Sequence, residues 1–135
     1  MIYEYNLTIP AHTLAVSPAS LTLPLAPGII HKLEVEFPAG CNKAVLVTLR
    51  RGLRQVYPAN PDGQLSANAY TISFPEYYSV EDKPHQLEAY GWSPDTIYSH
   101  IITIRIGVLP RDVLEPGRDA ITCLGRLRGL LFGGK

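Results

Sequence analysis

Four histidines and two cysteines are the residues of this 135-residue chain best suited to metal binding or nucleophilic chemistry. The histidines are His12, His31, His85 and His100, and none stands two residues from another histidine or from a cysteine. A metal site on one strand needs ligands at that spacing, because side chains alternate between the two faces of a sheet. The spacing favours histidines on the surface or satisfied by neighbouring groups, and we expect no metal site and no cofactor.

Catalytic and phosphate-binding motifs are missing from the sequence. There is no GxSxG, no Walker loop and no GxGxxG, and Cys41 lies in a predicted loop without a neighbouring histidine. Glu34 and Glu36 share one side of a predicted strand, which is typical of a solvated face. Cys41 and Cys123 make no disulfide framework, and we interpret them as free thiols that act as small apolar side chains. The alternative interpretation is a disulfide bridge between the two. We therefore expect a protein that is not an enzyme.

Aromatic residues provide the best small-ligand hypothesis. Trp92, Tyr77 and Tyr78 lie in or beside predicted loops, where exposed rings stack on the pyranose rings of sugars. These three side chains would give a carbohydrate-binding β-sandwich module. The other interpretation is that the strand tyrosines are half-buried core residues and that Trp92 packs under the turn before the last strand.

The elements that position these residues are predicted strands, and the clearest one lies in the stretch 91–110. One face carries Ile102, Ile104, Ile106 and Val108, and the other carries Ser99, Ile101, Thr103 and Arg105. Alternation of this length, rich in β-branched residues, predicts a strand with one buried face. Because the second face is also partly apolar, we expect it to be a central strand.

Similar alternation predicts shorter strands along the rest of the chain, at 2–9, 21–25, 29–37, 44–50, 53–57, 70–74 and 86–90. Pro24 cannot donate a ladder hydrogen bond, so its strand is expected at an edge or a bulge, and 75–84 is predicted to be mainly loop. Turn signals recur every 8 to 12 residues or so, which is the spacing of all-β sandwiches. The prediction is an antiparallel, jelly-roll-like β-sandwich of about eight strands.

Charge and hydropathy argue against a nucleic-acid partner and against a transmembrane segment. Lys plus Arg and Asp plus Glu both number 12, so no net positive charge attracts nucleic acid. No apolar run approaches the roughly 18 residues of a transmembrane segment, and the first residues lack the features of a signal peptide. We expect a soluble protein, made in the cytoplasm, with no nucleic-acid partner and no transmembrane segment.

The chain divides into a β-sandwich domain, 1–110, and a tail or arm, 111–135, that is predicted to be helical. Its apolar residues at helical spacing are Ile121, Leu124, Leu127 and Leu131. Gly125, Gly129 and Gly133 each lower helix propensity by about 1 kcal/mol relative to alanine, so the helix is marginal alone. It is interpreted as a helix that covers its own core, an amphipathic helix on a membrane surface, or an arm docked on a neighbouring subunit. We favour the arm, with those four residues as subunit contacts.

Four stretches between residues 7 and 110 together resemble a known group of proteins. They are LTIPAHT, GIIHKLEVEFPAGCNKAVLVTL, PANPDGQL and GWSPDTIYSHIITIRIGVLP. The pattern is similar to small all-β proteins of tailed-phage virions, which are head decoration or auxiliary capsid components. The resemblance implies a structural role in a virion assembled in the host cytoplasm. It also implies a homo-oligomer, with a trimer expected from capsid symmetry, bound to a shell such as a major capsid protein.

Overall fold

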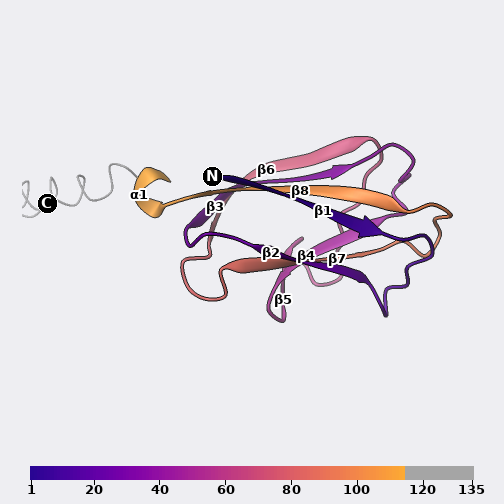
Figure 1. Ribbon diagram of the computed structural model, residues 1–135, viewed down its shortest axis with the longest axis horizontal. Coiled ribbons are helices and arrows are strands. Elements are labelled where there is room, and N and C mark those ends of the chain that lie inside the picture. Colours follow the sequence, from indigo (N-terminus) through magenta and orange to yellow (C-terminus); the bar gives the residue numbers. More distant parts are fainter. Residues whose placement is uncertain (115–135) are drawn as a thin grey trace, which may run out of the picture.

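The computed structural model describes residues 1–114, and its regular elements are eight strands and one short helix (Figure 1). In chain order these are β1 (Ile2–Ile9), β2 (Ala19–Pro24), β3 (Ile29–Phe37), β4 (Leu46–Arg51), β5 (Arg54–Tyr57), β6 (Tyr70–Ser79), β7 (Gln86–Trp92) and β8 (His100–Leu109). A four-residue helix, α1 (Arg111–Leu114), follows Pro110.

The strands form two antiparallel four-stranded sheets that face each other, ordered β1-β8-β3-β6 and β2-β7-β4-β5 (Figure 1). The first strand pairs with the last, β2 with β7, β3 with β6 and β4 with β5. This nested pairing is that of a long hairpin folded over on itself, which is the jelly-roll arrangement of eight strands. The predicted all-β, jelly-roll-like sandwich is confirmed.

The core lies between the two sheets, and β8 contributes one complete face to it. Ile102, Ile104, Ile106 and Val108 have no exposed surface, while the alternate residues of β8, except buried Gly107, are partly or largely exposed. Since β8 is hydrogen-bonded to β1 on one side and to β3 on the other, it is the central strand that its alternation predicted.

The outer face of the first sheet is polar and is joined by side-chain bonds across three strands. The guanidinium of Arg105 on β8 contacts Glu4 on β1 and Glu36 on β3, both at 2.9 Å. These contacts raise the pKa of Arg105, the hydrogen bond to Glu36 contributing most. Beside them, the Thr103 hydroxyl donates to the Asn6 side chain at 2.9 Å. Long-range pairing of β1, β8 and β3 is therefore supported by their solvated side chains as well as by the core.

Two prolines lie in edge strands, where the missing N–H faces no partner. Pro24 ends β2, at the edge of the second sheet, as predicted. Pro75 lies inside β6, at the edge of the first sheet, and this strand continues to Ser79. The prediction that 75–84 is mainly loop is wrong for its first half, because an edge strand tolerates a proline and β3 shifts its register opposite it, between Ile30 and Lys32.

The predicted subunit contacts in the tail, Ile121, Leu124, Leu127 and Leu131, lie outside the described residues, as does Cys123. Cys41 is fully buried, and this burial raises the pKa of its thiol. Within residues 1–114, no helix is both long and apolar enough to span a membrane.

Candidate functional site

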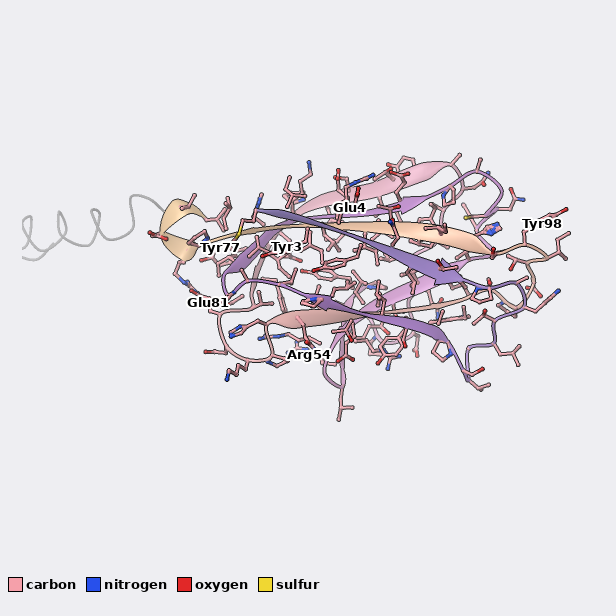
Figure 2. All side chains as sticks on the ribbon, viewed as in Figure 1. Tyr3, Glu4, Arg54, Tyr77, Glu81 and Tyr98 are labelled. Carbon is pink, nitrogen blue, oxygen red and sulfur yellow. The ribbon has the colours of Figure 1, made fainter. Side chains whose placement is uncertain are left out.

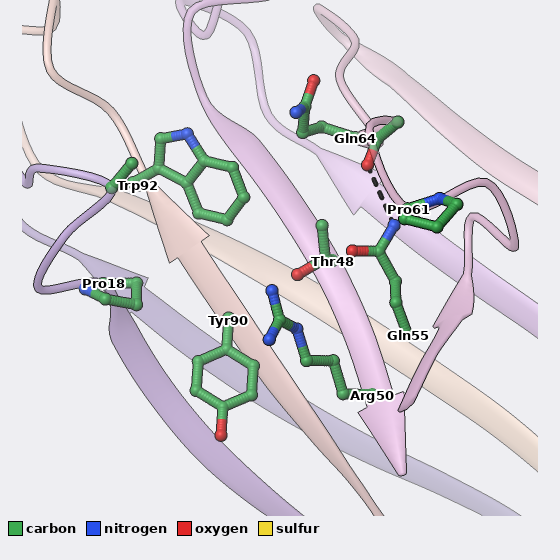
Figure 3. Close-up of a pocket in the computed structure, with 10 residues that line it drawn as sticks. Pro18, Thr48, Arg50, Gln55, Pro61, Gln64, Tyr90 and Trp92 are labelled. Atoms are coloured by element: carbon green, nitrogen blue, oxygen red, sulfur yellow. Dashed lines mark hydrogen bonds between the residues drawn. The ribbon is translucent and has the colours of Figure 1, made fainter. Parts of the chain in front are cut away.

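A pocket of about 450 Å³ opens on the outer face of the second sheet (Figure 3). Its floor is formed by Thr48 and Arg50 of β4 together with Tyr90 and Trp92 of β7. Its walls are two loops and strand β5, which contribute Ala15, Pro18, Gln55, Pro61, Gly63 and Gln64. The volume lies in the range of small-molecule sites in proteins.

Strand register brings the floor residues together. Thr48 lies directly opposite Tyr90, Leu46 opposite Trp92 and Arg50 opposite Glu88. Residues two apart on a strand point to the same face, so both strands present these side chains outward while Val47 and Leu49 fill the core. The floor is therefore built on regular, paired backbone.

Arg50 and Tyr90 form a cation–π pair in the floor. The guanidinium carbon of Arg50 is 5.2 Å from the centre of the Tyr90 ring. The Tyr90 hydroxyl donates to Glu88 Oε2 at 3.0 Å, and this hydrogen bond, with burial as a second cause, raises the pKa of Tyr90. Across the described part of the chain Arg50 forms no ion pair, so its positive charge faces the pocket without a carboxylate partner.

Two polar atoms of the floor are buried and unsatisfied. Thr48 is 1% exposed, and neither its Oγ1 nor the Nε of Arg50 has a hydrogen-bond partner among residues 1–114. Such a group costs about 1–3 kcal/mol when it is left unpaired, and buried polar groups in folded proteins are nearly always satisfied. Both atoms belong to residues of the pocket floor.

Gln55 fixes one wall of the pocket. Its Nε2 contacts the carbonyl oxygens of Pro58, Asn60 and Gly63 at 2.9, 3.0 and 3.0 Å. The Gly63 amide also donates to the Asn60 carbonyl at 2.9 Å, which closes a turn over Asn60-Pro61-Asp62-Gly63. The amide oxygen of Gln55 is left to face Thr48 (Figure 3).

The structure separates the three aromatics predicted to stack on sugars. Trp92 lines the pocket, whereas Tyr77 and Tyr78 lie on β6 in the other sheet. The Tyr78 ring is half-buried, 6.2 Å from the ring of Tyr57, and the Tyr77 hydroxyl accepts from Arg111 at 3.1 Å. The ring that accompanies Trp92 is that of Tyr90.

Thr48, Arg50 and Gln55 are not among the site residues predicted from the sequence. A usable signal was present, because Thr48 and Arg50 alternate with inward-facing Val47 and Leu49 and must point outward. The sequence does not show which strand lies next to β4 and shares that outer face. The pairing of β4 with β7 joins residues about 40 positions apart, and it places the two aromatics beside the arginine.

A second surface lies at the end of the sandwich opposite α1 (Figure 1). There Ile97, Tyr98 and Ile101 are 69%, 71% and 54% exposed, and we refer to these three residues as the apolar end. Figure 2 shows Tyr98 projecting beyond the strands. A groove of about 650 Å³ runs between Tyr98 to Ile101 and the loop 38–42, and His100 Nε2 lies 3.3 Å from the Gly40 carbonyl.

Three of the four histidines, His12, His85 and His100, lie against backbone carbonyl oxygens. The Nδ1 atoms of His85 and His12 lie 2.8 and 3.3 Å from the carbonyl oxygens of Val80 and Pro94. In the described range no three histidine, cysteine, aspartate or glutamate side chains cluster in a way that could hold a metal ion.

No protein-family model matches this chain, and no curated protein matches it. Among solved structures, it is similar to a de novo designed double-stranded β-helix, with a TM-score of 0.40 and 10% identity over 78% of this chain and 99% of that one. It is also similar to PirA, with a TM-score of 0.39 and 12% identity over 78% of this chain and 94% of that one. A third similar structure comes from the disulfide-linked pili of Bacillus endospore appendages, with a TM-score of 0.35 and 14% identity over 81% of this chain and 90% of that one. Similarities at these TM-scores carry no inference about what this chain does.

Proposed function

We propose that this chain is a non-enzymatic structural protein that assembles with copies of itself and decorates or stabilises the protein shell of a virion. The jelly-roll sandwich is compatible with this role, because viral capsid domains use that architecture, as lectins and cupins also do. The resemblance of four stretches between residues 7 and 110 to tailed-phage head components points the same way. The observation that carries the proposal is the apolar end.

The apolar end has the character of an interface. Its three large apolar side chains are each more than half exposed; Tyr98 and Ile101 line the groove, and Ile97 lines a neighbouring pocket together with Tyr98. Contiguous exposed apolar surface is uncommon on monomers and marks interaction sites. Covering these side chains would remove apolar area from water at about 25 cal/mol per Å².

Hydrogen bonds hold the loop that presents Ile97 and Tyr98. The Ser93 hydroxyl donates to the Pro10 carbonyl at 3.1 Å, and the His12 amide donates to the Thr96 carbonyl at 3.2 Å. Thr96 is buried, and its hydroxyl donates to the Ser93 carbonyl at 3.0 Å. A surface that is already ordered loses less conformational entropy on binding, which favours association.

The occupant that we propose for the apolar end is the tail of a second copy. Strand β8 begins at the apolar end and finishes beside α1, so the chain leaves the sandwich at the opposite end (Figure 1). The proposed tail contacts are Ile121, Leu124, Leu127 and Leu131. A donor at one end and an acceptor at the other give a head-to-tail contact, which closes into a ring when the rotation allows. A trimer is the ring expected from capsid symmetry.

Light scattering on the full chain and on a version ending at Pro116 tests this proposal. We expect a discrete oligomer for the full chain and a monomer for the shortened one, which retains all eight strands. An oligomer of unchanged size after shortening would contradict the tail as the occupant. A full chain that is monomeric at micromolar concentration would contradict self-assembly itself.

A further inference from the structure

We propose that the pocket over β4 and β7 binds a saccharide that carries a carboxylate, with the acid group on Arg50 and the sugar ring on Trp92. This binding site lies on the outer face of the second sheet and uses none of the residues of the apolar end. It is therefore a function additional to assembly, and it can be tested separately.

The charge of the ligand follows from Arg50, which is the only ionisable cation among the residues that line the pocket. Its register partner Glu88 is engaged by the Tyr90 hydroxyl and forms no ion pair with Arg50. A planar guanidinium binds a carboxylate through two parallel hydrogen bonds. One positive charge matches a carboxylate, whereas a phosphate monoester carries about 1.5 to 2 negative charges near neutral pH.

The side chains around Arg50 suit a ligand that contains a sugar ring. Figure 3 shows Trp92 and Tyr90 on one side of Thr48 and Arg50, and Gln55 on the other. An aromatic face suits the apolar C–H face of a pyranose, and ring hydroxyls both donate and accept hydrogen bonds. The amide oxygen of Gln55 faces the floor of the pocket and can accept from such hydroxyls.

The single tryptophan of the chain makes the test direct, because Trp92 fluorescence reports on this pocket alone. The full chain would be titrated with two pairs of glycans that differ in charge: sialyllactose with lactose, and trigalacturonic acid with its methyl ester. We expect a saturable change with at least one acid and binding at least about tenfold weaker for its neutral partner, since hydrogen bonds to charged groups contribute that much. No saturable response to either acid, or equal binding of acid and neutral partner, would overturn the proposal.

One variant and a matched control assign the effect to the pocket. Arg50→Gln is expected to weaken binding of the acid by about 10- to 100-fold and to remove the preference over the neutral glycan. Arg54→Gln makes the same change of charge at an exposed residue of neighbouring β5, outside the pocket, and is expected to leave the affinity unchanged. Equal losses in the Arg50 and Arg54 variants, or full affinity in Arg50→Gln, would contradict the assignment.

Discussion

The guanidinium of Arg50 lies 5.2 Å from the centre of the Tyr90 ring, and the hydroxyl of that same tyrosine donates to Glu88 at 3.0 Å. Glu88 thereby holds the ring, and the ring holds the cation, without any carboxylate neutralising Arg50 among residues 1–114. The arrangement is fixed before a ligand arrives, so little side-chain entropy remains to be lost on binding.

Replacing Thr48 by valine is expected to leave the free energy of unfolding unchanged or to raise it by up to about 1 kcal/mol. The reason is that the substitution removes a buried hydroxyl with no hydrogen-bond partner in the described structure while keeping the side-chain shape. Urea unfolding followed by circular dichroism gives the value.

Thr96 provides the matched comparison, because it is also buried but its hydroxyl donates to the Ser93 carbonyl at 3.0 Å. Thr96→Val therefore breaks a hydrogen bond that is made, and a loss of about 1 kcal/mol or more is expected. If both valine variants lost the same stability, Thr48 would be a satisfied residue and the pocket floor would be wrongly described.

Gly91 is required where the two sheets approach each other. A Cβ at this position would lie 2.3 Å from Cδ1 of Ile9, on the facing sheet. Overpacking of a core typically costs 1–3 kcal/mol, and we expect Gly91→Ala to destabilise the protein by about that amount in urea unfolding.

The facing residue offers a test of the cause. Ile9→Val alone removes Cδ1 and should cost about 0.5–1.5 kcal/mol. In the Gly91→Ala background the same change removes the clashing atom, so its cost should shrink or reverse. Strict additivity of the two free-energy changes would show that the loss in Gly91→Ala arises elsewhere.

Tyr57 makes stability depend on alkaline pH. Its pKa is raised well above the ordinary value, mainly by burial, with the Glu76 carboxylate adding to the effect. In the unfolded chain tyrosine loses its proton near pH 10, while the folded state retains it. The folded state is thus the better proton binder in that window, so stability is constant below about pH 9 and falls as the pH rises beyond 10.

Tyr57→Phe is expected to reduce the difference in unfolding free energy between pH 8 and pH 11. Tyr70→Phe, at a ring that is 64% exposed, is the control and should leave that difference as it is in the parent protein. A Tyr57→Phe variant with the full alkaline loss would place the responsible group elsewhere.

Most of the fold could be predicted because strand alternation is a local signal. The buried face of β8 and the edge position of Pro24 followed from residue types alone. The pocket could not be predicted in this way, since it exists only where β4 lies beside β7. Local alternation shows that Arg50 points outward, but it does not show which strand lies next to it.

The separation of Tyr77 and Tyr78 from Trp92 has the same origin. Two aromatics next to each other in the sequence suggest a shared surface, yet neighbours on a strand point to opposite faces. With Pro75 inside edge strand β6, the segment is extended, and the ring of Tyr78 lies near Tyr57 while Tyr77 is about half exposed. The three predicted stacking residues are therefore separated because Tyr77 and Tyr78 belong to a strand whose extent was not predicted, owing to Pro75.

The molar mass of the full chain in solution, with the apolar end intact and altered, tests the assembly proposal most directly. The altered version carries Ile97→Ser and Tyr98→Ser, and the control is Leu53→Ser, which removes an even more exposed apolar side chain from the turn between β4 and β5. We predict a discrete oligomer for the parent and for Leu53→Ser, and a monomer for the double variant at the same concentration. A double variant that keeps the parent's mass, or a parent that is monomeric, would contradict assembly through the apolar end.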